Sequence, residues 1–322
     1  MKGVSIVICT YNGKSRLIKT LDYIQNLVFD QPWELVVVDN ASTDGTEEFV
    51  MEYLENWSNS TVLTCDTPGK NFALWVGFRN IKYEYVLICD DDNYLFPNYL
   101  QVGYQLLEDH EKVGALGGNG LVPENMDFPD WLIPLRKTLA IGPQGKKNGR
   151  IPNFVGLYGA GCFFRKSALD KLIKLGYFTT LTCRKGDSNL ISGGDIELCL
   201  AVQEIGYELW YESSLFFYHA IEYRRLTKKY IVNLRKSQAS NFPILESYKF
   251  KRFSNTKMFK KYLRKKHLEN LKKMVLAILS YLKNGGFEKR LQIEVFYSMV
   301  RSYYINLQTT IDSFDKLNRQ LK

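Results

Sequence analysis

The sequence predicts an α/β fold in which a mainly parallel sheet is flanked by helices. Short runs that are apolar at nearly every position, such as residues 4–9 and 85–89, alternate with segments whose apolar residues recur at helical spacing. Continuously apolar strands are typical of a parallel sheet that is covered on both faces. Three of these runs end in polar clusters, and such sheets bind ligands beyond the carboxyl ends of their strands.

The first half of the chain supplies most of the expected strands. Each strand pattern ends in residues that favour turns, for example Asn12 and Gly13 after the first strand. In chain order we expect a strand over 4–9, a helix through Leu17, Leu21 and Ile24, a strand over 33–38, a helix over 46–55, and strands over 61–65 and 85–89. Right-handed crossovers between parallel strands would bring the strand ends to one edge of the sheet.

The second half begins with a long segment rich in proline and glycine, residues 121–158, which contains Trp131. A long loop in a compact domain usually binds something, so we expect a binding loop here. In chain order there follow a glycine-rich strand within 156–165, a helix over 167–175, a polar turn over 192–195, a helix from Ile196 to Ile205, and short strands over 207–211 and 215–218. From residue 258, two apolar stripes at helical spacing, separated by Gly285 and Gly286, predict a helical hairpin.

The composition is that of a soluble globular protein. Of the 322 residues, 45% are hydrophobic and 24% are charged, and no apolar run reaches the roughly 18 residues that span a membrane. The first residues lead directly into a strand pattern and lack the cleavage site of a secretory signal. The six cysteines form no C-x-x-C pair, which favours reduced thiols and a cytoplasmic location over a disulfide framework.

The net charge of +9 is concentrated at one end of the chain. Residues 1–244 carry 25 Lys or Arg against 28 Asp or Glu, whereas residues 245–322 carry 18 against 6. We therefore divide the chain into a body over 1–244 and a basic helical extension over 245–322. Alternating basic and aromatic residues over 249–273 predict peripheral contact with an anionic membrane, although packing on the body or a homodimer through these helices would also explain the pattern. No nucleic-acid-binding signature is present, so we expect no nucleic acid partner.

Three consecutive carboxylates, Asp90, Asp91 and Asp92, follow the apolar run 85–89. Like charges this close raise one another's pKa unless a positive charge compensates them. Mg²⁺ or Mn²⁺ is the expected partner, since hard cations bind carboxylates and keep positions open for phosphate oxygens. An exposed acidic turn is the alternative, and a phosphoryl or nucleotidyl transferase would use the same chemistry.

The other strand ends carry groups suited to a nucleotide. Thr10, Tyr11 and Asn12 follow the first strand and offer an aromatic ring on which one base can stack. Neither G-x-G-x-x-G nor a P-loop is present. Asp39 ends the second strand, where an acidic group accepts hydrogen bonds from a ribose or base, although a role in capping the next helix would explain it as well.

Two further residues are candidates for chemistry. Asp195 precedes a helix and is either the general base that deprotonates an acceptor hydroxyl or simply the N-cap of that helix. His219 follows the last short strand and is either a metal ligand or a packed histidine.

Together these motifs resemble family 2 glycosyltransferases of the Rossmann-like GT-A fold. The matching segments, in chain order, are VSIVICTYNG, ELVVVDNASTDGT, YVLICDDDNYLFP, GAGCFFRKSAL, GGDIELCLAVQEIGYELWY and FFYHA, within residues 3–225. The resemblance implies an inverting, metal-dependent transfer of a hexosyl or N-acetylhexosaminyl group from a nucleotide sugar, usually a UDP sugar, to an acceptor hydroxyl. It also implies a nucleotide-binding half over 1–120, an acceptor half over 121–244, and a place in cell-surface polysaccharide synthesis on a glycan or lipid-linked acceptor.

The resemblance assigns roles to individual residues, which we list in chain order. Thr10, Tyr11, Asn12, Asp39, Asp90 and Asp91 would bind the nucleotide sugar, Asp92 and His219 the metal, and Asp195 would be the catalytic base, with Trp131 and Gly194 on the acceptor side. Two positions depart from the family pattern. Gly194 replaces a glutamate that usually precedes the base, and Asn93 replaces the last aspartate of D-x-D-D.

Overall fold

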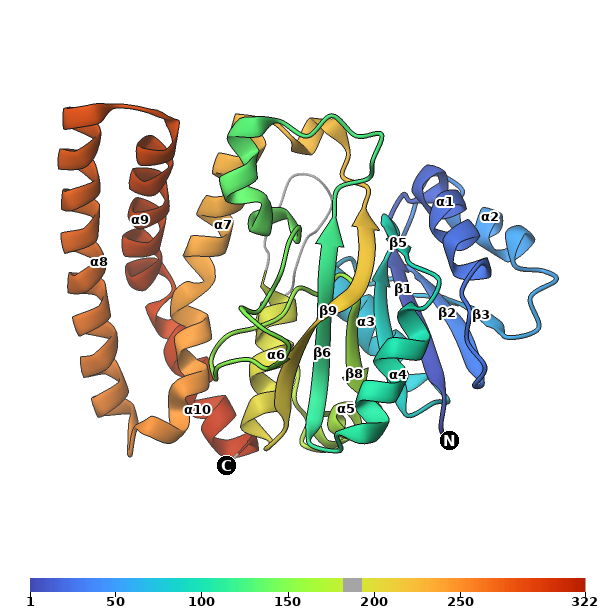
Figure 1. Cartoon of the computed structure of the whole chain (residues 1–322). Helices are drawn as coiled ribbons and strands as arrows, with labels where there is room; N and C mark the ends of the chain where they lie inside the picture. Colours follow the sequence, from blue (N-terminus) through green and yellow to red (C-terminus); the bar gives the residue numbers. More distant parts are fainter. Residues whose placement is uncertain (182–192, 322) are drawn as a thin grey trace.

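The structure is a computed structural model that describes residues 1–181 and 193–321 (Figure 1). Its strands are β1 (Val4–Thr10), β2 (Trp33–Asp39), β3 (Ser60–Thr64), β4 (Tyr85–Asp90), β5 (Asn93–Leu95), β6 (Val113–Leu121), β7 (Gly149–Arg150), β8 (Cys162–Arg165) and β9 (Glu208–His219). They form one sheet in the order β3-β2-β1-β4-β8-β6-β9-β5, with β7 paired to β9. The predicted α/β fold is therefore confirmed.

Helices surround the sheet. The α-helices are α1 (Lys14–Gln25), α2 (Thr46–Tyr53), α3 (Lys70–Arg79), α4 (Tyr99–Asp109), α5 (Lys166–Lys174), α6 (Gly194–Glu204), α7 (Lys228–Glu246), α8 (Thr256–Asn284), α9 (Phe287–Ile305) and α10 (Leu307–Gln320). Short 3₁₀ segments are η1 (Asp130–Leu139), η2 (Tyr223–Arg225) and η3 (Ser247–Arg252). The predicted helices and strands of the first half lie within about two residues of their expected bounds, because their apolar periodicity is strong.

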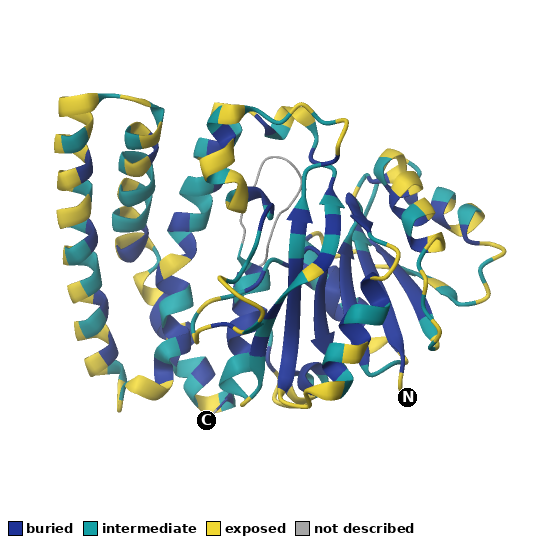
Figure 2. Ribbon diagram, viewed as in Figure 1, coloured by how far each residue is buried: buried dark blue, intermediate teal, exposed yellow. Residues whose placement is uncertain are grey.

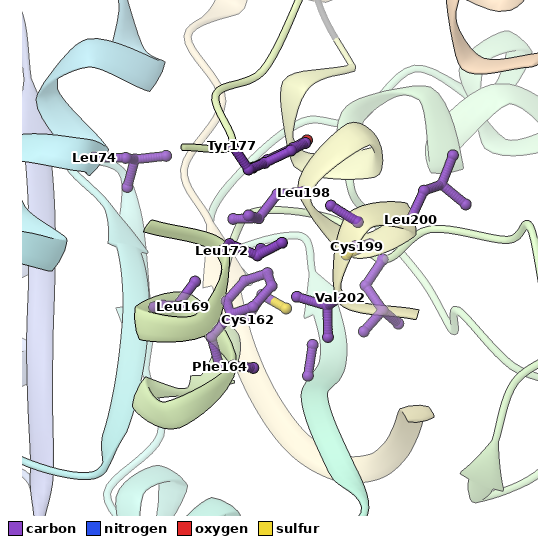
Figure 3. Close-up of a cluster of buried hydrophobic side chains, with 14 of the residues drawn as sticks. Leu74, Cys162, Phe164, Leu169, Leu172, Tyr177, Leu198, Cys199, Leu200 and Val202 are labelled. Carbon is purple, nitrogen blue, oxygen red and sulfur yellow. The ribbon is translucent and has the colours of Figure 1, made fainter. Parts of the chain in front are cut away.

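The sheet is buried on both faces, as continuously apolar strands require. On β1, Val7 belongs to one core cluster while Ile6 and Ile8 belong to the other, because successive side chains point to opposite faces. The first cluster includes residues of α3, α5 and α6, whose side chains meet near Cys162 and Phe164 of β8 (Figure 3). The second includes residues of α1, α2 and α4.

Two parts of the sheet differ from expectation. Strands β3, β2, β1 and β4 are parallel, but β8 pairs antiparallel with both β4 and β6. The two short strands expected over 207–211 and 215–218 are one strand, β9. The polar residues at its centre had suggested that the strand is interrupted there. The backbone continues its pairing with β6 through a register shift between Gly117, which pairs with Tyr211, and Asn119, which pairs with Phe216.

The segment over 121–158, expected to be a loop, contains η1 and the two-residue strand β7. The sequence prediction also missed α3, α4, β6 and α7, and α7 is one of the longer helices. Two predicted features, the start of the polar turn at Ser192 and the thiol of Cys183, lie outside the described residues. The other five cysteines are free thiols.

The C-terminal region begins as the predicted hairpin and then returns to the body (Figure 1). The chain turns at Gly285 and Gly286 between α8 and α9, and the second apolar stripe breaks again at Asn306 before α10. Side chains of this region, including Phe259 and Phe314, join the core cluster of α3, α5 and α6. Within residues 1–181 and 193–321, no helix combines the length and the apolar character needed to cross a bilayer.

Candidate active site

A cavity of about 1560 Å³ opens beyond the carboxyl ends of β1 and β4. It brings together most of the predicted site residues although they are far apart in the sequence. Those that line it are Thr10, Tyr11, Asn12, Asp90, Asp91, Asp92, Gly194, Asp195 and His219. Asp39 and Trp131 are not among the lining residues. The cavity is therefore formed where the topology of a parallel sheet predicts a ligand site.

The loop after β1 is tied to the carboxylate of Asp91. Oδ2 of Asp91 accepts hydrogen bonds from Thr10 Oγ1 at 2.7 Å and from a terminal nitrogen of Arg16 at 2.8 Å. Arg16 Nε reaches the other oxygen at 3.2 Å, so the guanidinium binds the carboxylate through two nitrogens. Burial raises the pKa of Asp91, and the bond from Arg16 offsets part of this rise. Asp91 thus fixes the loop that carries Tyr11.

Asp90 is paired with Lys70, the first residue of α3. Burial of the ammonium lowers the pKa of Lys70, but the adjacent carboxylate of Asp90 outweighs this effect, so the pKa is raised overall. Cys9 and Asp195 contribute to the rise. Lys70 is therefore a cation that lies among the strand ends and within the field of the predicted base.

Asp92 is buried between Arg225 and His219. Its Oδ2 accepts a hydrogen bond from Arg225 at 3.2 Å, and its Oδ1 lies 3.4 Å from His219 Nε2. Burial alone would raise the pKa of Asp92, but the charges of His219, Arg225 and Lys70 hold it below its ordinary value. Each of the three consecutive carboxylates therefore meets a different basic side chain. These basic side chains therefore compensate part of the charge for which a divalent cation was expected.

The imidazole of His219 is oriented by the backbone. Nδ1 lies 2.8 Å from the carbonyl oxygen of Leu139, which can only accept, so Nδ1 carries a proton. When Nε2 carries no proton, it is an acceptor that faces the acceptor oxygen of Asp92. Two acceptors that face each other in a buried position fit either a protonated imidazole or a cation held between them.

Asp39 ends β2 and is buried at 2% exposure. Its Oδ2 accepts the backbone N–H of Ser42 at 3.0 Å, but its Oδ1 is buried with no hydrogen-bond partner within the described residues. The next residues, Asn40 and Ala41, do line the cavity. An unpaired buried acceptor is costly, so this oxygen fits a donor group supplied by a ligand.

The loop around Asn12 links the first two strand ends. Asn12 has a positive φ of 47°, and its Oδ1 accepts the backbone N–H of Thr43 at 2.8 Å. Asn40 similarly joins the second strand end to the start of α3, because its Oδ1 accepts the N–H of Gly69 at 2.7 Å. These amides hold the loops that border the cavity in fixed positions.

Asp195 lies in the first turn of α6 and borders the cavity from the second half of the sheet. Its Oδ2 accepts the backbone N–H of Gly159 at 3.0 Å. A Cβ added at Gly159 would lie 3.1 Å from the Cβ of Asp195, so glycine permits this close approach. The glycine-rich segment before β8 thus orients the carboxylate without any side chain.

Glu197, two residues further along α6, is fully buried and was not predicted. Its Oε1 accepts the N–H of Thr180 at 2.8 Å and the hydroxyl of Tyr248 at 2.9 Å, and its Oε2 accepts the N–H of Leu181 at 2.8 Å. The hydroxyl of Tyr177 lies 2.6 Å from that of Tyr248. This cluster, which we call the Glu197 clasp, joins the helix of Asp195 to η3 at the start of the extension.

Trp131 lies away from the cavity lining. Its ring packs edge to face on Phe287 of α9 and belongs to a cluster formed by η1, α7 and α9. Other residues of η1 and one side of α7 line the cavity instead, among them Thr138, Arg235 and Gln238.

Sequence reasoning missed the basic residues of the site, Arg16, Lys70 and Arg225. The sequence positions of Arg16 and Lys70 nevertheless indicate that they can reach the site. Arg16 lies in the first turn of α1, and Lys70 starts α3 directly after Pro68 and Gly69, where a cation can reach a neighbouring strand end.

A metal ion is implied by the family resemblance, and the residues present can be compared with what such an ion needs. Over residues 1–181 and 193–321, no three His, Cys, Asp or Glu side chains gather as a metal-binding cluster. Asp92 and His219 alone supply one oxygen and one nitrogen. Mg²⁺ and Mn²⁺ sites of substrate phosphates often use only one or two protein ligands, so this pair fits.

Comparison with known families gives one match that covers more than half of the chain. The model of glycosyl transferase family 2 matches residues 5–173. The matched segment contains the ends of β1, β2 and β4 but stops before Asp195 and His219.

Two curated relatives carry the same name. Poly-β-1,6-N-acetyl-D-glucosamine synthase of Staphylococcus epidermidis is 24% identical over 215 residues, which cover 66% of this chain and 48% of the relative. The synthase of Staphylococcus aureus (strain COL) is 22% identical over the same length, with the same shares. This chain spans about half the length of the curated relatives it matches.

Two solved structures share the fold. S. aureus TarS 1-349 in complex with UDP-GlcNAc has a TM-score of 0.55 at 15% identity, covering 94% of this chain and 92% of TarS 1-349. The mannosyltransferase PcManGT from Pyrobaculum calidifontis, in complex with GDP-Man and Mn²⁺, has a TM-score of 0.57 at 20% identity, covering 98% and 86%. At these identities the likeness concerns the fold alone.

Proposed function

This chain belongs to glycosyl transferase family 2, and from that membership we propose that it transfers a sugar from a nucleotide diphosphate sugar to an acceptor hydroxyl with inversion at the anomeric carbon. The observation that carries the proposal is the cavity in which Asp195 lies together with the polar ends of β1 and β4. A carboxylate on one side and cationic side chains on the other are what an in-line displacement requires.

The nucleotide would bind at the ends of β1 and β2. Tyr11 is 42% exposed at the rim of the cavity and offers its ring to the base. The unpaired Oδ1 of Asp39 would accept a hydrogen bond from the base or ribose. Asp90 and Asp91 are engaged by Lys70 and Arg16, so they would act on the donor mainly through the loop and the lysine that they position.

The transfer itself would use Asp195 as general base. Its carboxylate takes the proton of the acceptor hydroxyl while the oxygen bonds to the anomeric carbon and the bond from that carbon to the diphosphate breaks. The backbone N–H groups of Gly159 and Ile196 each hold one oxygen of the carboxylate, and each oxygen keeps a further lone pair for the acceptor. Lys70 and Arg225 lie in the same cavity and would stabilise the negative charge that develops on the departing diphosphate.

A divalent cation would be held by Asp92 and His219. When bound, it supplies further positive charge to the leaving diphosphate as a Lewis acid. The Leu139 carbonyl fixes the tautomer of His219 so that Nε2 remains free to coordinate. PcManGT, which shares the fold, was solved with Mn²⁺.

The donor and acceptor are proposed from the relatives. A UDP sugar of the N-acetylhexosaminyl type is supported by the UDP-GlcNAc bound to TarS 1-349 and by the names of the curated relatives. A growing polysaccharide of the cell surface, free or lipid-linked, is the corresponding acceptor, and the cytoplasm is the compartment where such donors are made. The division into a body over 1–244 and an extension over 245–322 remains part of this proposal.

The decisive variant is Asp195→Asn, which keeps the acceptor oxygen for Gly159 and removes the base. We expect turnover to fall about 10²- to 10⁴-fold while donor affinity changes little. Asp170→Asn, which removes a carboxylate of α5 that pairs with Lys166, is the matched control and should retain activity. Loss of nucleotide binding with retained turnover in Asp195→Asn would contradict the assignment.

The donor is found by thermal-shift titration with UDP, GDP and CDP sugars, each with and without Mn²⁺. A ligand that binds only the native state raises its stability. We expect the largest shift with a UDP sugar and Mn²⁺. NMR of the product anomer then tests inversion.

A further inference from the structure

The outer side of α8 carries a row of exposed aliphatic residues. Leu268, Val275, Leu276, Leu279 and Leu282 are 58%, 52%, 65%, 58% and 74% exposed. Leu268, Val275, Leu279 and Leu282 are separated by seven, four and three residues and lie on one side of the helix, and Leu276 lies at the edge of that side. We call these five residues the α8 patch.

The α8 patch is not the packing surface of the helix. Phe259, Leu263, Asn270 and Ala277 are its buried residues, and helical geometry places them on the side opposite the patch. Figure 2 shows this outer side of α8 as largely exposed along its whole length. Exposed leucines in adjacent turns are uncommon in a protein that meets only water, so the patch indicates an interaction.

The same side of the helix is basic over residues 257–272. Its exposed cations there are Lys257, Lys261, Arg264, Lys265 and Lys272. Over the whole of α8, nine Lys or Arg residues stand against one acid, Glu269, and that glutamate is paired with Lys266. The outer side therefore runs from a cationic half to an apolar half that ends at Lys283.

The positive charge of this side of α8 favours an anionic membrane over a second copy of the chain. A second copy of the chain would bring two strongly cationic helices together, and like charges across an interface oppose association. An anionic bilayer offers phosphate groups to the lysines and an acyl region to the leucines, which is the environment that a basic amphipathic helix prefers.

We propose that α8 lies on the surface of an anionic membrane and inserts the α8 patch below the head groups. The basic part of this surface lies within the segment 249–273 predicted from sequence, but its apolar part differs. Two of the aromatic residues of that segment, Phe250 and Phe259, are buried against the body. The contact therefore lies further along the helix, over 268–282, and it does not depend on the proposed sugar transfer.

The test is flotation of the full chain with vesicles. Phosphatidylcholine vesicles containing phosphatidylglycerol should retain the protein, and pure phosphatidylcholine should retain it about tenfold less. The variant Leu276→Ser/Leu279→Ser/Leu282→Ser should lose about tenfold or more of the binding. Ile18→Ser/Met51→Ser, which removes two exposed apolar residues from the body, is the matched control and should bind as the wild type.

Charge is tested separately with Lys261→Glu/Lys265→Glu against Lys112→Glu/Lys174→Glu on the body. Lys261→Glu/Lys265→Glu should bind the anionic vesicles more weakly, and its binding should depend less on salt concentration. Lys112→Glu/Lys174→Glu should bind as the wild type does. All variants should keep the wild-type Tm, which excludes misfolding. Equal binding of the patch variant and the wild type overturns the proposal, and so does a dimer in light scattering that the patch variant abolishes.

Discussion

The Glu197 clasp predicts that one hydroxyl group in the C-terminal region stabilises the helix of Asp195. In Tyr248→Phe the ring remains but two hydrogen bonds are lost, to Glu197 at 2.9 Å and to Tyr177 at 2.6 Å. Tyr248 is 1% exposed and Glu197 is fully buried, so water cannot replace the lost partner easily. The substitution therefore leaves a buried carboxylate with one donor fewer.

The expected loss of stability follows from the two hydrogen bonds that the Tyr248 hydroxyl makes. A hydrogen bond to a charged group is worth about 1.5–3 kcal/mol and one between neutral groups about 1 kcal/mol. Because Tyr248 donates to Glu197, Tyr177 is the donor of the second bond, and its hydroxyl keeps only the longer bond to the carbonyl oxygen of Glu197, at 3.4 Å. We expect the free energy of unfolding to fall by about 2–4 kcal/mol, with a drop of several degrees in Tm.

The assay is urea unfolding of the wild type, Tyr248→Phe, Glu197→Gln and the double variant. The two single effects should fail to add, with a coupling of about 1 kcal/mol or more, because Tyr248→Phe removes the same bond whose charged acceptor Glu197→Gln replaces by a neutral amide oxygen. Tyr304→Phe, at a residue that is 83% exposed, should stay within about 0.5 kcal/mol of the wild type. Additive effects, or an unchanged stability of Tyr248→Phe, would refute the reasoning.

Three further predictions concern the site. Gly159→Ala should lower turnover about tenfold or more with little change in Tm, since its Cβ would lie 3.1 Å from the Cβ of Asp195 and displace the base; unchanged kinetics would contradict that contact. Asp92→Asn should raise the Mn²⁺ concentration required for transfer about 10- to 100-fold, measured after removal of metal with EDTA, and an unchanged requirement would exclude Asp92 as a ligand. Burial raises the pKa of Glu197 above 4.5 in the folded state, so from pH 4.5 upward the unfolded chain loses this proton first and stability falls as pH rises. The difference in free energy of unfolding between the wild type and Glu197→Gln, measured by urea unfolding, should therefore shrink as pH rises from 4.5. A difference that grows with pH would contradict a raised pKa of Glu197.

The parallel half of the fold could be predicted from the sequence because its strands are short, apolar and separated by clear turns. The ends of β1 and β4 were found for the same reason, since a polar cluster that directly follows a buried strand marks the edge of the sheet where ligands bind. The antiparallel position of β8 between β4 and β6 had no local signal, because strand order depends on packing between distant segments.

The candidate site was predicted in part. Asp195 and His219 were found as residues with two open interpretations each, and the structure places both at the cavity. Trp131 was placed on the acceptor side by its presence in a long loop, yet its ring packs on Phe287. The pairing of Arg16 and Lys70 with the aspartates depends on the spacing between different loops, which a single sequence does not contain.

The contribution of the last helix to the main core has a consequence for how the protein emerges from the ribosome. Val7 and Val36 belong to the same core cluster as Phe314 and Leu321. At about 5–20 residues per second, the first strands wait roughly 15–60 s for the residues that complete their cluster. During that time the nascent chain exposes apolar surface on one side of the sheet, and we expect it to depend on chaperones until synthesis passes α10.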